Sequence, residues 1–175
     1  MKRYWRAGVL LSIWFLAAVL ALSSCDPVGD NAIAVLGPEN PLVRRGPEHR
    51  PGQPCLVCHD GALGDPPAFT VAGTIYEKPS STVGLQGATV TLVDSTGSQY
   101  VSQPTNDAGN FYATPSDWNP TFPITTVSVT GSAGIPTMKS AIGRSGSCAS
   151  CHFNPPGPTS AGQVCIVLDD GGLPL

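Results

Sequence analysis

The sequence has few charged side chains and little basic character. Charged residues make up 12% of its 175 residues, and Lys and Arg together number only 9. Arg44-Arg45 is the longest basic run after the first six residues. Binding to nucleic acid depends on Lys and Arg side chains that neutralise phosphates. The sequence therefore argues against nucleic acid as a partner.

The patterns of common enzyme sites are missing as well. The chain has no phosphate-binding loop with the Walker spacing, and no Ser, His and Asp in an arrangement that suggests a catalytic triad. Asp60, Asp65 and Asp169-Asp170 lie beside glycines, which indicates solvated turns and not a paired general acid and base. We therefore expect a carrier or binding protein more than an enzyme.

The first 24 residues have the features of a lipoprotein signal peptide. A basic start, Met-Lys-Arg-Tyr-Trp-Arg, precedes a mostly apolar run from Ala7 to Leu22. A helix of that length spans only about 24 Å, which is short for a transmembrane helix. The run ends in Leu22-Ser-Ser-Cys25, which resembles a bacterial lipobox and implies lipidation of Cys25. An ordinary cleavage site and an uncleaved helical anchor are the alternatives.

The mature protein is expected to be exported and held at a membrane by the lipid on Cys25, in the periplasm or on the cell surface. Removal of residues 1–24 takes away Lys2, Arg3 and Arg6, so the formal net charge changes from -3 to -6. The 151 residues that are left suit one domain with tails. They leave no room for a second, catalytic domain.

Glycine and proline together account for 38 residues, so we expect many turns and little helix. Residues 25–48 show no sustained hydrophobic period and many of these breakers, and they are predicted to form a flexible, extended tether. Such a tether would let a lipid-held protein stand away from its membrane.

The middle of the chain predicts antiparallel β-strands separated by turns. The segments rich in Val, Thr, Ile and aromatic residues are Phe69–Tyr76, Ala88–Asp94, Gln99–Gln103, Asn110–Thr114, Ile124–Gly131 and Val164–Leu168. Apolar and polar residues alternate in the second and fifth of them, which predicts one buried face in each. The fold class is therefore predicted to be all-β, with a single small antiparallel β-sandwich over residues 67–135.

Three segments of this region resemble the carboxypeptidase regulatory-like (transthyretin-like) β-sandwich. They are Val71-Ala-Gly-Thr-Ile-Tyr76, Gly87-Ala-Thr-Val-Thr-Leu92 and Thr105-Asn-Asp-Ala-Gly-Asn-Phe-Tyr112. The resemblance covers roughly residues 68–131. It implies a stabilising or displaying module that carries no catalytic residues, and an unrelated small sandwich with similar turns is the alternative.

Two Cys-x-x-Cys-His motifs flank the predicted sandwich, in segments 49–66 and 136–175. They are Cys55-Leu-Val-Cys58-His59 and Cys148-Ala-Ser-Cys151-His152, and they hold two of the chain's three histidines. Both resemble the haem-attachment motif of c-type cytochromes. The resemblance implies two haem c groups, with the four cysteines as thioether anchors and with His59 and His152 as proximal iron ligands.

Other uses of these cysteines stay open. One is a single tetrahedral zinc ion held by both cysteine pairs, although this leaves the two histidines without a role. Another is a pair of local disulfides, although thioredoxin-like redox pairs need a βαβ setting that the sequence lacks. A third is a single haem, with the other motif fortuitous.

Haem iron in an electron carrier normally has six ligands, so each motif needs a distal partner. With Met1 removed, His49 and Met138 are the ordinary candidates that are left. Ligation by both would make one haem His/His and the other His/Met. Cys165 is left over, either as a small buried side chain or in an intermolecular disulfide.

These expectations combine into one function, outer-sphere electron transfer by an exported, lipid-anchored cytochrome with two haem c groups. A redox protein partner is implied, together with a membrane contacted through the lipid. A haem sensor or peroxidase with an open iron site is one alternative. The other is an exported structural or binding lipoprotein whose cysteine pairs hold zinc or disulfides.

Overall fold

The structure, a computed structural model, describes residues 27–39, 41–61, 67–131, 136–153 and 157–166. Within these ranges it contains one α-helix, six short strands and two 3₁₀ helices, labelled η. No helix in the described ranges is long and apolar enough to cross a lipid bilayer. The predicted signal peptide, residues 1–24, and the predicted lipidation site Cys25 lie outside the described residues.

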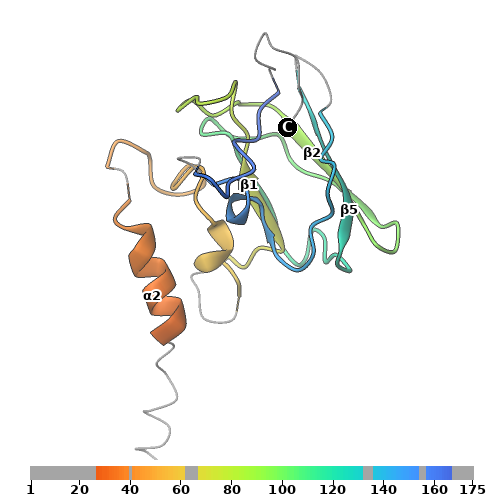
Figure 1. The fold of residues 1–175 in the computed structure, drawn as a ribbon, viewed down its shortest axis with the longest axis horizontal. Helices are drawn as coiled ribbons and strands as arrows, with labels where there is room; N and C mark the ends of the chain where they lie inside the picture. The colour runs from red at the N-terminus through yellow and green to blue at the C-terminus, as the bar shows by residue number, and fades with distance from the viewer. Residues whose placement is uncertain (1–26, 40, 62–66, 132–135, 154–156, 167–175) are drawn as a thin grey trace, which may run out of the picture.

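The strands form two small sheets of three strands each (Figure 1). One has the order β4-β1-β6 and the other the order β3-β2-β5. The strands are β1 (Val71–Thr74), β2 (Thr89–Asp94), β3 (Gln99–Val101), β4 (Asn110–Ala113), β5 (Ile124–Thr130) and β6 (Gly146–Ser147). The described part of the chain is therefore mostly β, in an arrangement consistent with a small β-sandwich.

The alternation predicted for two of the strands is confirmed. Val90 and Leu92 of β2 are buried, as are Val127 and Val129 of β5, while their nearest neighbours within each strand are partly or fully exposed. These two strands pair with each other in antiparallel register, Val90 opposite Val129 and Leu92 opposite Val127. Their apolar faces therefore lie on the same side of the sheet.

The prediction for the last strand differs from the structure. Of the predicted strand Val164–Leu168, the described residues form one parallel bridge, between Cys165 and Tyr76. In the sheet that contains β1, one edge is formed by β6, which runs parallel to β1, so the pairing is not purely antiparallel. β6 has two residues, too few to show the alternation by which strands are predicted from sequence.

One hydrophobic core connects the two sheets. Its most deeply buried side chains are Val71 and Ile75 in and beside β1, Val90 and Leu92 in β2, and Ile124 in β5, each at most 1% exposed. They come from both sheets, so neither sheet buries its apolar face without the other. The core therefore fixes the position of β1, against which both Cys-x-x-Cys-His motifs pack.

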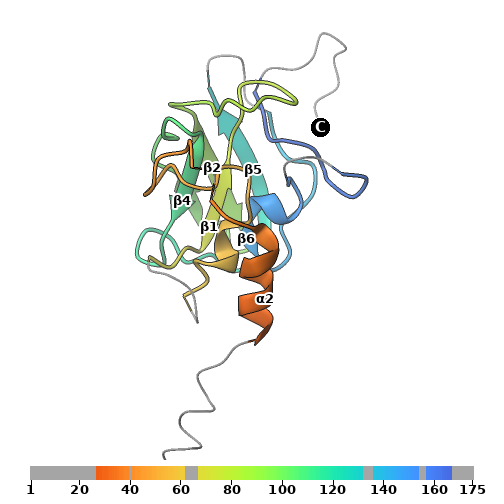
Figure 2. The same ribbon diagram turned by 90° about the vertical axis from the view of Figure 1, so that its left-hand side faces the viewer.

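The chain before the first motif contains a helix where an extended tether was predicted. α2 spans Pro27–Leu36, within residues 25–48, and lies beside the first motif (Figures 1 and 2). Proline suits the first helical position, and Gly37, with φ of +69°, ends the helix in the left-handed region. The tether prediction was wrong here because it treated Pro27 and Gly37 as residues that interrupt a helix, whereas they lie at its two ends.

Asp94 joins two loops at the end of β2. Its carboxylate accepts hydrogen bonds from the backbone N–H groups of Thr96, Ser98 and Thr121 at 2.8 to 2.9 Å, and from the Thr96 hydroxyl at 2.7 Å. The bond from Thr121 is the largest cause of a lowered pKa of Asp94, about 2 against an ordinary 3.8. The ionised carboxylate therefore holds the turn before β3 to the loop before β5.

Replacing Asp94 by Asn is expected to remove a pH-dependent part of the stability. The folded-state pKa lies below the unfolded value, so ionised Asp94 stabilises the fold above pH 3.8, and this contribution is lost as the pH falls to about 2. Asp94→Asn should unfold at a lower temperature at neutral pH and lose less stability on acidification. Thermal unfolding followed by circular dichroism measures both, with exposed Asp107→Asn as control. Equal acid sensitivity of Asp94→Asn and the parent chain would contradict this role.

Candidate haem-attachment sites

The two Cys-x-x-Cys-His motifs adopt the same local structure. η1 spans Cys55–Val57 and η2 spans Cys148–Ser150. In each motif the carbonyl of the first cysteine accepts hydrogen bonds from the N–H groups of the second cysteine and the histidine. The distances are 3.2 and 3.0 Å in the first motif and 3.1 and 2.9 Å in the second. Each motif therefore brings two thiols and one imidazole together on a single tight turn.

A backbone carbonyl orients each of the two motif histidines. His59 Nδ1 lies 2.9 Å from the Pro67 carbonyl oxygen, and His152 Nδ1 lies 2.7 Å from that of Gly162. A carbonyl oxygen only accepts hydrogen bonds, so we infer the tautomer with the hydrogen on Nδ1. Nε2 then carries the lone pair that binds a metal ion, as in metal-ligating histidines whose other nitrogen donates to a carbonyl.

A later segment of the chain bonds to each motif, but at a different position. The N–H of Phe69 donates to the carbonyl of the motif histidine His59 at 2.8 Å, and the N–H of Ala161 donates to the carbonyl of the second motif cysteine, Cys151, at 2.8 Å. The likeness of the two motifs is therefore confined to the Cys-x-x-Cys-His turns and the carbonyl bonds of their histidines.

A small cavity of about 50 Å³ adjoins the first motif. His49 and His59 both line it, and their ring centroids are 5.8 Å apart. His59 packs on Phe69 with centroids 4.5 Å apart, and Phe69 stacks on Tyr112 at 4.6 Å. The structure therefore brings His49 to the first motif and backs His59 with two aromatic rings.

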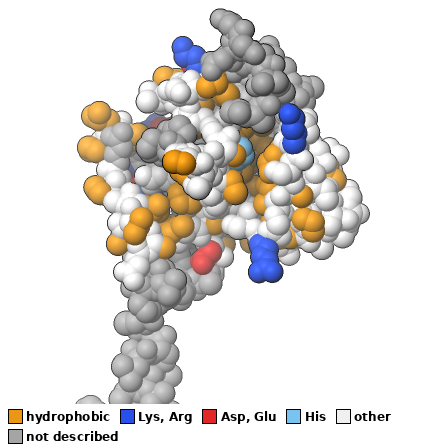
Figure 3. Space-filling view, viewed as in Figure 1, with side chains coloured by type: hydrophobic (Ala, Val, Ile, Leu, Met, Phe, Trp, Pro, Cys, Tyr) orange, Lys and Arg blue, Asp and Glu red, His pale blue; other side chains and the backbone are white. Residues whose placement is uncertain are grey.

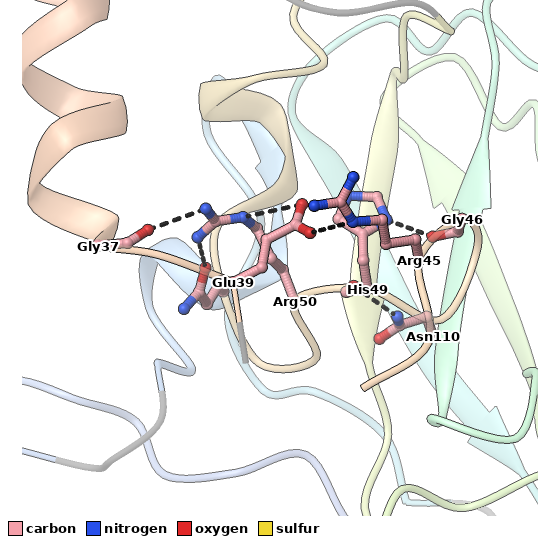
Figure 4. A network of polar contacts seen from close by, with 8 residues as sticks. Gly37, Glu39, Arg45, Gly46, His49, Arg50 and Asn110 are labelled. Carbon is pink, nitrogen blue, oxygen red and sulfur yellow. Dashed lines mark hydrogen bonds and ion pairs between the residues drawn. The ribbon is translucent and has the colours of Figure 1, made fainter. Parts of the chain in front are cut away.

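His49 is held in place from two neighbouring segments (Figure 4). Its Nδ1 is hydrogen-bonded to the carbonyl of Gly46, and its own carbonyl accepts a hydrogen bond from Asn110 Nδ2 at 3.2 Å. The adjacent Arg50 donates to the carbonyl of Gly37 at 2.9 Å. These bonds tie the residues around His49 to β4 on one side and to the end of α2 on the other.

A much larger cavity, about 590 Å³, adjoins the second motif. It lies between the two sheets, because its walls include Phe111 of β4 on one side, and Val90 of β2 and Val127 of β5 on the other. Figure 3 shows a hollow with hydrophobic side chains around it and a histidine within it. Cavities of about 300 to 1,000 Å³ with mainly apolar walls are typical of sites for small molecules and cofactors.

Met138 lies at this second cavity together with Cys148, Cys151 and His152. It is partly buried against the core, and its N–H donates to the Val127 carbonyl at 2.8 Å, which fixes it beside β5. The structure thus groups each predicted distal residue with one motif, His49 with the first and Met138 with the second.

The second motif packs directly on β1 at Gly73. β6 runs beside β1 with Ala72 opposite Ser147, so Cys148 follows next to Gly73. A Cβ atom on Gly73 would lie 2.7 Å from Cys148 Cβ and 2.9 Å from its Sγ. Only glycine therefore fits at this position without a shift of the motif.

Replacing Gly73 by alanine is expected to displace the second motif. Overpacking of this kind costs about 1 to 3 kcal/mol of unfolding free energy, and Cys148 is the neighbour that has to move. The variant should unfold at a lower urea concentration. It should carry less of any group attached at Cys148, while a group attached at Cys55 should be retained. Gly157→Ala, whose Cβ would make only ordinary contacts at 3.4 Å and beyond, is the matched control. Unchanged stability and attachment in Gly73→Ala would contradict this prediction, because it would show that Cys148 can move to accept a methyl group at position 73 without cost.

The first thiol of each motif is not an activated one. Burial is the largest cause of the raised pKa of Cys55, about 11, and of Cys148, about 12; the nearby Cys55 thiol also raises the pKa of Cys148. Redox-active cysteines need the opposite, a lowered pKa. Among the described residues no disulfide forms, and no three His, Cys, Asp or Glu side chains gather as a metal site.

Some residues at the two sites carry no recognisable signal in the sequence. Phe111 and Tyr112 look like ordinary strand residues there, and the pairing of β4 with β1 is what brings them to the motifs. Cys165, predicted to be either a buried side chain or an intermolecular link, is partly buried at the second cavity.

Comparison with known proteins gives no match to a family model, to a curated protein or to a solved structure.

Proposed function

We propose that this chain is an exported, lipid-anchored c-type cytochrome that carries two covalent haem c groups and exchanges electrons with a redox protein partner. The observation that carries the proposal is the duplicated site. Two Cys-x-x-Cys-His turns have the same hydrogen bonds, and in each the histidine Nδ1 is bonded to a backbone carbonyl. Each turn also faces its own cavity. Cysteines that only stabilise the fold would not need this repeated arrangement of the imidazoles.

The residue types at each motif suit a covalently bound haem. The second cavity, about 590 Å³, has the volume of a cofactor site, whereas the first, about 50 Å³, would have to widen to admit one. The two thiols of a motif would form the thioether bonds, and the following histidine, His59 or His152, would supply Nε2 to the iron. When bound, each haem supplies a one-electron iron(III)/iron(II) couple. The protein orients the imidazoles through Pro67 and Gly162 and keeps water away with apolar walls such as Phe69 and Ile142.

His49 and Met138 are the proposed distal ligands. His49 and His59 both line the first cavity, with ring centroids 5.8 Å apart, so the two imidazoles would be the residues that hold the iron there. The Nδ1 of His49 is bonded to Gly46, as is usual for a histidine that binds metal through Nε2. Met138 shares the second cavity with His152.

Different distal ligands make the two haems chemically unequal. Thioether ligation raises the reduction potential of a haem relative to ligation by a second histidine. Electrons are therefore expected to collect on the second haem.

We also propose that the β structure is a carboxypeptidase regulatory-like sandwich that serves as a scaffold. In support, the three segments with this resemblance fall on β1, on β2 and on the turn that leads into β4. In that turn the Asn106 side chain accepts hydrogen bonds from the N–H groups of Ala108 and Asn110, both at 3.0 Å. A scaffold without catalytic residues suits an electron carrier.

Membrane attachment through Cys25 is a further part of the proposal. It is supported by the lipobox-like Leu22-Ser-Ser-Cys25 that ends the apolar run. Cys25→Ala should move the protein from the membrane fraction to the soluble fraction, with both haems retained. Fractionation with haem staining measures this, and Cys165→Ala is the cysteine control. Continued membrane association of Cys25→Ala would contradict lipid anchoring at this residue.

The haem content of the exported chain tests the main proposal. Expressed together with a haem c maturation system, the protein should give a pyridine haemochrome spectrum that corresponds to about two haems per chain. The haem stain should survive a denaturing gel, because the bonds are covalent. A chain without covalent haem, in cells that mature a control cytochrome, would overturn the proposal, and zinc bound in its place would favour the zinc alternative.

A further inference from the structure

Exposed apolar side chains gather in the segment that follows the proposed lipidation site. In the described part of the chain, the large hydrophobic side chains that face solvent include Ile33, Val35 and Leu42, all within ten residues. Val35 is 85% exposed and Leu42 is 92% exposed, and none of the other exposed large hydrophobic side chains exceeds 54%. Single exposed apolar residues are normal, whereas a group of them indicates a contact surface. We call these three residues the α2 surface.

The helix α2 presents one side to the protein and another to solvent. Leu36 is partly buried and lines the first cavity, and α2 contacts the first motif at η1. Successive helical residues are rotated by about 100°, so Val35 points away from the direction of Leu36. Ala32, three residues before Val35 and on the same face, is also exposed. α2 lies on the outside of the molecule, away from β2 and β5 (Figures 1 and 2), and hydrophobic side chains follow that edge in Figure 3.

The position of Cys25 limits what can cover this surface. Cys25 lies two residues before Pro27, the first residue of α2. Two residues of chain span at most about 7 Å, so a lipid on Cys25 would hold the start of α2 at the bilayer surface. A helix of 10 residues is about 15 Å long and cannot cross a bilayer. It can lie along the surface with apolar side chains inserted below the headgroups.

Lipid charge contributes little to such a contact. Residues 26–50 contain three arginines and four carboxylates, a formal net charge of -1. The Glu39 carboxylate lies 3.8 Å from the guanidinium groups of both Arg45 and Arg50 (Figure 4). Attraction to anionic headgroups is therefore largely cancelled within the segment. Burial of apolar side chains is the effect that remains.

We propose that the α2 surface docks on the membrane that holds the lipid of Cys25, with Val35 and Leu42 inserted at the boundary between headgroups and acyl chains. This inference rests on the proposed function, because it requires the lipid. A few apolar side chains bind a bilayer only weakly, so the lipid has to supply the high local concentration, and Cys25→Ala is still expected to leave the membrane.

Docking of α2 would fix the orientation of the protein. α2 contacts η1, and Arg50 donates to the carbonyl of Gly37, at the end of the helix, at 2.9 Å. The first Cys-x-x-Cys-His motif would therefore be held close to the bilayer instead of standing away from it on a tether. A partner of this motif would have to reach it beside the membrane surface.

The test places a tryptophan on the α2 surface of the full-length, lipidated protein. After removal of residues 1–24 the sequence contains one tryptophan, Trp118, which is buried in the core. Val35→Trp and Leu42→Trp proteins are incorporated into phosphatidylcholine vesicles with and without bromine on the upper part of the acyl chains. Bromine quenches a tryptophan that touches it, and the ratio of the two intensities cancels any fixed quenching within the protein.

Bromination is expected to remove most of the fluorescence that either added tryptophan contributes, and to leave the parent protein unchanged. Val101→Trp is the matched control, because Val101 is an exposed valine of β3, in the sheet that does not contact α2. Its fluorescence should not respond to bromine.

A second set of variants separates the native side chains from the added probe. In Leu42→Trp protein, the further change Val35→Ser should reduce quenching several-fold, whereas Val101→Ser should not alter it. Addition of phosphatidylglycerol to the vesicles should also leave the quenching unchanged, because apolar burial and not lipid charge carries the contact.

Each remaining outcome counts against docking. With the protein recovered in the vesicle fraction, absence of quenching in Val35→Trp overturns the inference and leaves the proposed function standing. Equal quenching in Val101→Trp, no effect of Val35→Ser, or quenching that requires phosphatidylglycerol overturns it as well. Fluorescence of Val35→Trp that changes with protein density but not with bromination would assign the surface to a second copy of the chain. A parent chain that does not enter the vesicle fraction overturns both the inference and lipid anchoring, while the haem count still decides the electron carrier.

Discussion

Replacing Cys148 and Cys151 together by alanine is expected to leave one covalent haem per chain instead of two. Those two thiols are the proposed covalent attachment at the second cavity, which lies between the sheets. The first motif makes its own contacts with β1, so its attachment should persist. The reciprocal change, Cys55→Ala with Cys58→Ala, should likewise leave one haem, at the second site.

The two single-haem proteins are expected to differ from each other. The haem left by the first double variant would have His59 and His49 as neighbours, whereas the haem left by the reciprocal one would have His152 and Met138. Because methionine ligation raises the potential, the second of these proteins should be reduced at the higher potential. The spectra and titrations of the two should then add up to those of the parent protein, except for any mutual influence of the haems.

Intact-mass spectrometry and a haem-stained denaturing gel measure the number of haems in each variant. Cys165→Ala is the control, because Cys165 is another partly buried cysteine at the second cavity but is not in a motif. It should keep two haems. Retention of two haems by both double variants, or loss of both haems from either one, would contradict independent attachment at the two motifs.

The sequence was most informative where a pattern is local. The spacing of each Cys-x-x-Cys-His motif is fixed by the size of the group it is predicted to hold, so the motifs stand out without a structure. Strands β2 and β5 were predicted because their alternating residues reflect one buried face each. The grouping of His49 and Met138 with the motifs also follows chain proximity, since His49 lies 6 residues before Cys55 and Met138 lies 10 residues before Cys148.

Features that depend on pairing between distant segments were not predictable. β6 has two residues and is defined only by its partner β1, and the position of Phe111 opposite Gly73 depends on the register of β4. Sequence reading also missed α2, since breakers at helix ends look like breakers in a loop until the ends are known. The packing of both motifs on one strand, β1, likewise needs the fold.

Replacing Met138 by alanine is expected to remove the sixth ligand of the second iron. Met138 lines the cavity with His152 and is fixed beside β5 by its backbone bond to Val127. Because that bond does not involve the side chain, the substitution should leave the backbone around position 138 in place. Axial ligands set haem potentials over a range of about 0.8 V. Loss of the thioether should lower the potential of the second haem by on the order of 0.1 V and turn its spectrum from low-spin to high-spin.

Two further variants separate ligation from packing. Met138→Leu keeps an apolar side chain of similar volume and so should lose the ligand without opening a cavity. Met138→His offers a nitrogen ligand in its place, and it should restore a low-spin spectrum while keeping the lowered potential. Electron paramagnetic resonance and redox titration of the protein that lacks the first motif's cysteines, Cys55→Ala with Cys58→Ala, report on the second haem alone.

The parent protein provides the sharpest distinction between the candidate functions. If Met138 ligates the iron, the second haem is six-coordinate in both oxidation states, it binds carbon monoxide poorly, and the protein is an electron carrier. If Met138→Leu and the parent have the same spectrum and potential, the second iron has another ligand or none. An iron that is high-spin in the parent protein would have an open coordination position. A small ligand or a peroxide could bind there, and the haem sensor or peroxidase alternative would then replace the carrier at this site.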